Sequence, residues 1–227
     1  MMYCFMEIAT FIFLIAILIM SVVVHEVSHG FIALALGDFT AKYAGRLTLN
    51  PLKHLDPVGS FLFPALLVML GVPPFGWARP VPYNPYNLRD QKWGPALVAV
   101  AGPLSNILVA FVFGMMFRFA AISEVAASTA FLTLLVVVIY INILLAVFNL
   151  IPIPPLDGSK ILFAVLPHRY LAIQRLLEAY GFFILLILIF IGRGILGLVI
   201  LPPTFLLAQL LTGLSPQELL GALAAFF

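Results

Sequence analysis

The stretch IMSVVVHEVSHGFIALALG (19–37) carries His25, Glu26 and His29 in a run apolar enough to lie in a lipid bilayer. Ionisable groups are energetically costly there, so a chain keeps them only with a partner or a function. Residues four apart on a helix share a face, so both imidazoles can coordinate one ion. A catalytic Zn²⁺ site needs a third protein ligand and leaves its fourth position to water. The spacing therefore predicts a zinc site, with Glu26 placed to take a proton from the water and relay it to a leaving amine.

The third ligand has to come from the remaining carboxylates and histidines, most of which lie in polar loops or near the chain ends. Asp157 differs, because FNLIPIPPLDG (148–158) interrupts an otherwise spanning helix with prolines just before it. Non-helical backbone at membrane depth is tolerated where it lines a cavity, and the prolines could turn the Asp157 carboxylate toward the metal. Alternatively, Asp157 caps a helix that begins at Gly158. Asp56 or His54 would then be the third ligand.

A second polar feature inside an apolar segment is AGPLSN (101–106). Gly102 and Ser105 are small enough for close contact between helices, and Asn106 brings an amide into the segment. The pattern fits helix packing with a hydrogen-bonded Asn106 as well as it fits contact of Asn106 with a substrate. Asn142 and Asn149 raise the same question.

The composition indicates what class of protein carries these residues. Of 227 residues, 64% are hydrophobic and 9% are charged, and the mean hydropathy is +1.20, which is typical of a polytopic membrane protein. A net charge of +2 without a long basic run argues against a nucleic-acid partner. The single cysteine, Cys4, excludes an intramolecular disulfide and a cysteine-based metal site.

The elements that must position the motifs are apolar helices, separated by polar or proline-rich segments. A span needs about 20 residues. We expect helices over 7–36, 95–119 and 131–150, a last apolar region over 180–211 interrupted at Arg193 and at Pro202 and Pro203, and a short interfacial helix after Ser215. GRLTLNP (45–51) alternates in the manner of a strand. Since no linker is recognisable, we expect one domain over 1–227, with a catalytic core over 7–166 and a C-terminal span and tail over 178–227.

The basic residues predict how the spans are oriented. They gather between the first two spans and after the proline-rich break, and the positive-inside bias places both segments in the cytoplasm. They are Lys42, Arg46, Lys53, Arg79, Arg89, Lys92, Arg169 and Arg175. The short segment 60–71 must then enter and leave on one side, and the loop around Glu124 lies outside. The two histidines and Asp157 reach a similar depth, near the cytoplasmic face.

The motifs HEVSH (25–29) and NLIPIPPLDG (149–158) resemble those of the site-2 protease family of intramembrane zinc metalloproteases, and AGPLSN and GWARPVPYNP (76–85) extend the likeness. The resemblance implies an all-α polytopic membrane fold with a three-helix catalytic core, additional C-terminal spans and a small membrane-reentrant β element. It implies one Zn²⁺ per chain, bound by His25, His29 and Asp157. Glu26 would be the general base, and Asn149 would lie near the substrate carbonyl.

The same resemblance implies which substrates are cleaved and where. They would be single-span or membrane-anchored proteins, cleaved within the bilayer of a prokaryotic cell, with the active site toward the cytoplasm. AGRLTLNP (44–51) looks like the family's β element, which pairs with an extended substrate. Leu47, Thr48, Leu49 and Asn50 of this element are therefore candidate substrate contacts, and Asn106 is a further candidate. The chain resembles a compact member, because no PDZ-like insertion is recognisable between its spans.

Two other functions use the same residues. In a transporter or channel, His25, Glu26, His29 and Asp157 would form a transient site for Zn²⁺ or protons, as intramembrane ionisable residues often do. The lack of internal repeats argues against a transporter, and so does a base placed beside a ligand pair. In an inactive scaffold the metal would be structural, and Glu26 would have no task.

Overall fold

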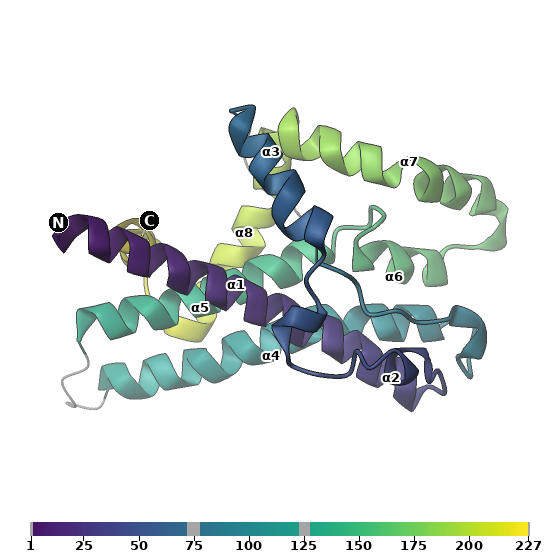
Figure 1. Cartoon of the computed structure of the whole chain (residues 1–227), viewed down its shortest axis with the longest axis horizontal. Coiled ribbons are helices and arrows are strands. Elements are labelled where there is room, and N and C mark those ends of the chain that lie inside the picture. Colours follow the sequence, from purple (N-terminus) through teal and green to yellow (C-terminus); the bar gives the residue numbers. More distant parts are fainter. Residues whose placement is uncertain (1, 72–77, 123–127, 227) are drawn as a thin grey trace.

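The computed structural model describes residues 2–71, 78–122 and 128–226, and helices account for most of them (Figure 1). The longer helices are α1 (Met2–Ala35), α4 (Gly94–Ile122), α5 (Thr129–Asn149), α7 (Leu171–Phe190) and α8 (Arg193–Thr212). The shorter ones are α2 (Thr40–Tyr43), α3 (Phe63–Met69), α6 (Asp157–Val165) and α9 (Pro216–Phe226). Short 3-10 helices cover Pro51–Lys53, Pro85–Asn87 and His168–Tyr170, and a π-helical turn covers Pro57–Leu62.

Five helices in the described part of the chain are long and apolar enough to cross a membrane. They are Ile12–Ala35 of α1, Gly94–Ala121 of α4, and the whole of α5, α7 and α8. This finding agrees with the predicted all-α, multi-pass architecture, and the first three spans lie close to their predicted positions. Leu104 and Leu108 of α4 are exposed, as expected of side chains that meet lipid rather than water.

The core of the molecule forms around α5. Helix α4 packs against both α1 and α5, so the three lie side by side along the long axis of the molecule (Figure 1). Val137, Ile139 and Ile143 of α5 are completely buried, in one cluster with Ala110 of α4. Helices α8 and α9 also contact α5. The region that carries the motifs is therefore held by an apolar core made by its neighbours.

The C-terminal region differs from the prediction in two respects: two prolines do not interrupt α8, and α9 packs partly into the core. The helix breaks before Arg193, as expected, but Pro202 and Pro203 lie within α8 and do not end it. Prolines inside a membrane helix are tolerated when neighbouring groups compensate for the lost backbone donors. Ser215 caps α9 through a reciprocal pair of bonds with Glu218. One face of α9 enters the core, because Leu219 and Leu223 are buried.

Between α1 and α4, the described residues 36–71 and 78–93 contain no helix long enough to span a membrane. The π-helical turn, which Asp56 caps by accepting from the Val58 and Gly59 amides, runs into α3, a helix of 7 residues. That length is too short for a span, which fits a segment that enters and leaves on one side. Pro73 and Pro74, and Glu124 of the expected outside loop, lie outside the described residues.

The small β element is not confirmed. No strand is present in the residues that the structure describes, and 45–50 form turns and irregular backbone. The reason is local hydrogen bonding. The Thr48 carbonyl accepts from His54 Nε2 at 2.8 Å, and the Asn50 side chain accepts from the Leu52 amide and so caps the next 3-10 helix. Both polar groups are therefore engaged within the loop and not in a ladder.

A buried carboxylate fixes the loop before α4 to the end of α1. Asp38 is fully buried and accepts from the Asn84 amide at 2.7 Å, from Asn87 Nδ2 at 2.9 Å, and from the Thr40 amide and hydroxyl. Beside it, the Arg89 amide donates to the Leu36 carbonyl at 2.9 Å. These bonds hold the irregular segment 78–90 against α1.

We therefore expect Asp38→Ala to lower the free energy of unfolding by roughly 2–3 kcal/mol, because it leaves buried donors unpaired. Burial alone would raise the pKa of Asp38, but the hydrogen bonds from Thr40, Asn87 and Asn84 lower it below its ordinary value. The contribution is thus complete above the pKa of unfolded Asp38, and it disappears as the pH falls through the lower pKa of the folded state.

Thermal unfolding in detergent at neutral pH and near pH 3 tests this prediction. The gap between wild type and Asp38→Ala should be wide at neutral pH and narrower in acid. The exposed Asp90, which accepts from the Lys92 and Trp93 amides in the turn before α4, provides the matched control Asp90→Ala, with a smaller effect. Equal losses in the two variants would contradict the role assigned to Asp38.

Candidate metal centre and active site

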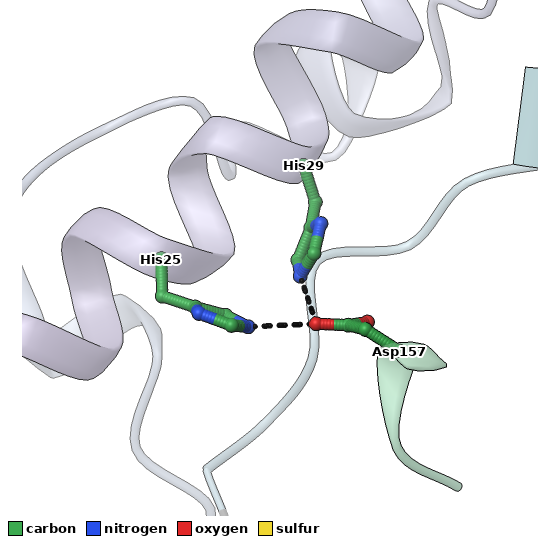
Figure 2. A group of neighbouring side chains, drawn as sticks. All are labelled: His25, His29 and Asp157. Atoms are coloured by element: carbon green, nitrogen blue, oxygen red, sulfur yellow. Dashed lines mark hydrogen bonds and ion pairs between the residues drawn. The ribbon is translucent and has the colours of Figure 1, made fainter. Parts of the chain in front are cut away.

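His25, His29 and Asp157 converge on one point. The two histidines lie one turn apart on α1, and their Nε2 atoms are 3.0 and 3.2 Å from the same Asp157 oxygen, Oδ2 (Figure 2). One ligand atom of each residue lies within 4.8 Å of the others. Ligand atoms about 2 Å from a tetrahedral ion are about 3.3 Å apart, so these separations suit a small cation.

The loop between α5 and α6 brings Asp157 to the histidines. Helix α5 ends at Asn149, and the prolines that follow prevent it from continuing. The chain then turns so tightly that a Cβ atom at Gly158 would overlap the Leu150 carbonyl. Helix α6 begins at Asp157, but its N-cap is Leu156 and no side chain caps it. The Asp157 carboxylate therefore faces the histidines and does not act as a helix cap.

Hydrogen bonds to the other ring nitrogens orient both imidazoles. His29 Nδ1 lies 2.7 Å from the Val98 carbonyl, and His25 Nδ1 lies 2.6 Å from Asn106 Oδ1. Both partners are oxygen acceptors, so Nδ1 carries the proton in each ring. The Asn106 amide is oriented by its own bonds, since Nδ2 donates to the Ser21 carbonyl and to Asn142 Oδ1. Each Nε2 lone pair is thereby directed at Asp157.

This donor set fits a divalent cation. Two imidazole Nε2 atoms and a carboxylate oxygen at these distances need a positive charge between them, which a proton or a bound cation supplies. Imidazole and carboxylate are ligands that Zn²⁺ uses, and histidine ligands commonly donate their other N–H to an oxygen. Gly102 of α4 leaves the space, because a Cβ there would lie 2.5 Å from the Nε2 atoms of both histidines.

Glu26 and Asn149 open onto a common cavity beside this cluster. The cavity has a volume of about 500 Å³, and His25, Glu26 and Asn149 all line it. Glu26 is half-buried, and its Oε2 accepts from the Val81 amide at 2.8 Å. Asn149 donates from Nδ2 to the Leu145 carbonyl at 2.9 Å. A carboxylate, an amide and an imidazole of the candidate metal centre thus meet where a substrate and a water molecule could enter.

The structure gives the other candidate substrate residues different positions. Asn106 is completely buried, and both of its amide atoms are engaged by His25, Ser21 and Asn142, so its observed role is to orient His25. None of Leu47, Thr48, Leu49 and Asn50 lines the cavity. Leu47 contacts α1 instead, because a Cβ at Gly30 would lie 2.6 Å from its Cδ2 atom.

Three contributors to the site were not predicted. Val98 and Val81 act through backbone groups, which no pattern of side chains reveals. The third is Gly102, which was read as a packing residue but lies against the metal ligands. Its spacing of four from Asn106 was a usable signal, because residues four apart on a helix face the same way.

Comparison with known proteins relates this geometry to a family. The family model described as "Peptidase family M50" matches residues 114–191, which include α5, Asp157 and α7. The protein named "Putative zinc metalloprotease YwhC" from Bacillus subtilis (strain 168) is 39% identical over 180 residues, which are 78% of this chain and 79% of that protein. The chain belongs to peptidase family M50, the site-2 protease family.

A second M50 relative supports the assignment. The protein named "Putative zinc metalloprotease Rip2" from Mycolicibacterium smegmatis is 32% identical over 188 residues, which are 80% of this chain and 68% of that protein. No solved structure matches the chain significantly. Because the chain belongs to this family, metal binding by His25, His29 and Asp157 is the property to test.

For this M50 chain we expect Gly102→Ala to reduce bound metal to a small fraction of the wild-type level, because the new Cβ would occupy space beside both Nε2 atoms. Metal content of the purified protein, measured by elemental analysis, is the readout. His29→Ala should lose metal as well. Gly197→Ala in α8, where a Cβ meets one side-chain atom at 3.7 Å, is the matched control and should keep its metal. Full occupancy in Gly102→Ala would show that the space is not needed.

Proposed function

We propose that this chain is an intramembrane zinc metalloprotease that hydrolyses peptide bonds of single-span or membrane-anchored proteins. The observation that carries the proposal is the convergence of three candidate ligand atoms, from His25, His29 and Asp157, beside a cavity that His25, Glu26 and Asn149 line. The names of the M50 relatives, which describe zinc metalloproteases, support the metal and the reaction class.

In this proposal His25, His29 and Asp157 hold one Zn²⁺ ion. When bound, zinc polarises the substrate carbonyl and lowers the pKa of a water molecule. Asn106 and Val98 keep the two imidazoles in the tautomer that binds a cation at Nε2. At a buried site, water cannot replace a lost hydrogen-bond partner of an imidazole. Loss of the acceptor at Asn106 or Val98 should therefore weaken metal binding.

Glu26 is the proposed general base. Its carboxylate removes a proton from water while the oxygen attacks the carbonyl carbon of the peptide bond. The C–N bond then breaks, and Glu26 returns the proton to the departing amine, so that one water molecule is consumed and a carboxylic acid and an amine are formed. The Val81 amide, which donates to Oε2, holds the carboxylate in position for both transfers.

Asn149 is the proposed partner of the substrate carbonyl. It lines the cavity with Glu26, and an amide donor there can stabilise the negative charge that develops on the carbonyl oxygen. A helical substrate hides its carbonyls in backbone hydrogen bonds, so the segment to be cleaved must first unwind. The irregular backbone of 78–83, which runs past Glu26, is a surface along which an extended segment could lie.

We further propose that the site opens toward the cytoplasm. The supporting observation is that eight of the eleven basic residues lie in the segments between α1 and α4 and after α6. They are Lys42, Arg46, Lys53, Arg79, Arg89, Lys92, Arg169 and Arg175. Arg118, at the other end of α4, is engaged structurally, because it donates to the Leu210 and Leu211 carbonyls at the end of α8.

The decisive test of the proposed reaction is Glu26→Gln, which keeps the size of the side chain but cannot accept a proton. We expect zinc content to stay at about one per chain while cleavage of single-span substrates falls roughly a hundredfold or more. Asp157→Asn should lose both metal and activity. A transporter would instead show zinc flux in liposomes without cleavage of any substrate by the wild type, and that result would refute the protease.

Orientation is tested by labelling single cysteines in a Cys4→Ser background. A cysteine in place of the exposed Arg89 or Arg175 should react with an impermeant thiol reagent only from the cytoplasmic side, and Glu124→Cys only from outside. Retained zinc content serves as the control for folding of each variant. Labelling at Arg89 from outside would overturn the proposed orientation.

A further inference from the structure

The cavity beside the candidate metal centre is polar at one end and apolar elsewhere. His25, Glu26 and Asn149 supply its polar groups. Its walls are formed by apolar side chains from α1, α5, α7 and the loop before α6, namely Val22, Leu145, Phe148, Leu156, Phe182 and Leu185. A volume of about 500 Å³ exceeds the space that a water molecule and a peptide group need, since a water molecule takes about 30 Å³. The proposed reaction leaves this apolar space unused.

Helix α7 forms the far wall and is fixed at two points. Leu185 is 2% exposed and packs in a cluster with Ile151, Leu156 and Ile200. One turn earlier, Gly181 lies against the loop that carries Asp157, because a Cβ there would be 2.6 Å from the Pro154 carbonyl. The wall therefore has a fixed position relative to the metal ligands.

Phe182 has a different environment from these two residues. Its side chain lines the cavity but remains 44% exposed, so the core does not need it. A large aromatic side chain at the open side of an apolar cavity can cover a ligand group without contributing much to folding. Phe182 is therefore the wall residue whose replacement should change substrate specificity without affecting folding.

We propose that this cavity binds a large apolar side chain, of the size of leucine or phenylalanine, that flanks the bond to be cleaved, and that Phe182 forms the outer wall of this specificity pocket. The inference rests on the proposed proteolytic function and adds to it the class of substrate. Among the described residues that line the cavity, the only groups that could pair with a charge are Glu26 and the imidazole of His25, so a charged flanking residue would lose its hydration without compensation.

The size of the effect follows from the value of burying apolar groups. One methylene in an apolar pocket changes specificity by about 10-fold or more, and leucine and phenylalanine each add several carbons to alanine, so each should be preferred over alanine by at least roughly 100-fold in kcat/KM. Phe182→Ala opens one wall, so the preference for the large residue over alanine should fall at least roughly threefold.

The experiment uses a single-span substrate with one cleavage site, in which the residue before or after the scissile bond is alanine, valine, leucine, phenylalanine or aspartate. Wild type, Phe182→Ala and Ile187→Ala are compared in detergent, with zinc content measured for each. Ile187 is the matched control, because it is an apolar residue of α7 that is 56% exposed and does not line the cavity. At one of the two positions, wild type and Ile187→Ala should share a preference that Phe182→Ala loses.

Binding provides a readout that does not depend on cleavage. Labelled peptides with alanine or leucine at the selected position are titrated into Glu26→Gln and into Glu26→Gln/Phe182→Ala, and fluorescence anisotropy gives the Kd values. A leucine preference that disappears with Phe182→Ala supports the pocket even if the wild type cleaves nothing, a result that would refute only the proposed protease. Cleavage by the wild type without any preference for large apolar residues, or a preference that Phe182→Ala leaves unchanged, would overturn the pocket.

Discussion

The Nδ1 hydrogen bonds of His25 and His29 determine how α1 and α4 meet. His25 pairs with Asn106, and His29 pairs with the carbonyl of Val98, which lies two turns earlier on the same face of α4. Because the order of the partners is reversed, the two helices run antiparallel where they cross. A slide of one helix by a single turn would remove both acceptors and leave buried donors unpaired, which is costly among apolar side chains. The register of the two helices is thereby linked to the tautomers of both imidazoles.

The same constraint extends from α4 to α5. Asn106 donates to Asn142, and Asn142 in turn donates to the Val138 carbonyl one turn back on α5. Both amides are completely buried, so each must find partners within the protein. Helix α5 leads directly into the loop that delivers Asp157. One chain of hydrogen bonds therefore connects the two helices that supply and orient the histidines with α5, which leads into the loop before the carboxylate.

The parts of this architecture that depend on side-chain chemistry could be predicted from the sequence. The long spans follow from hydropathy, and Asp157 follows from prolines that stop a helix at a depth where loops are otherwise excluded. The loop 45–50 could not be predicted, because its alternating residues suit a strand and only particular side-chain hydrogen bonds, such as that from His54 to the Thr48 carbonyl, decide otherwise. The role of Asn106 could not be predicted for a related reason. A buried amide can form hydrogen bonds with many kinds of neighbour, and its partner, His25, lies 81 residues away along the chain.

The glycines at 102 and 158 have an evolutionary consequence. Each lies so close to the groups it faces, the two imidazoles for Gly102 and the Leu150 carbonyl for Gly158, that a single added carbon would displace them. Every amino-acid substitution of glycine adds at least that carbon, so no substitution at either position preserves the side-chain volume. Drift at these positions would require the facing backbone to move first, in another segment of the chain. Descendants of this protein that keep the three candidate ligands are therefore expected to keep both glycines, whatever substrates they come to cleave.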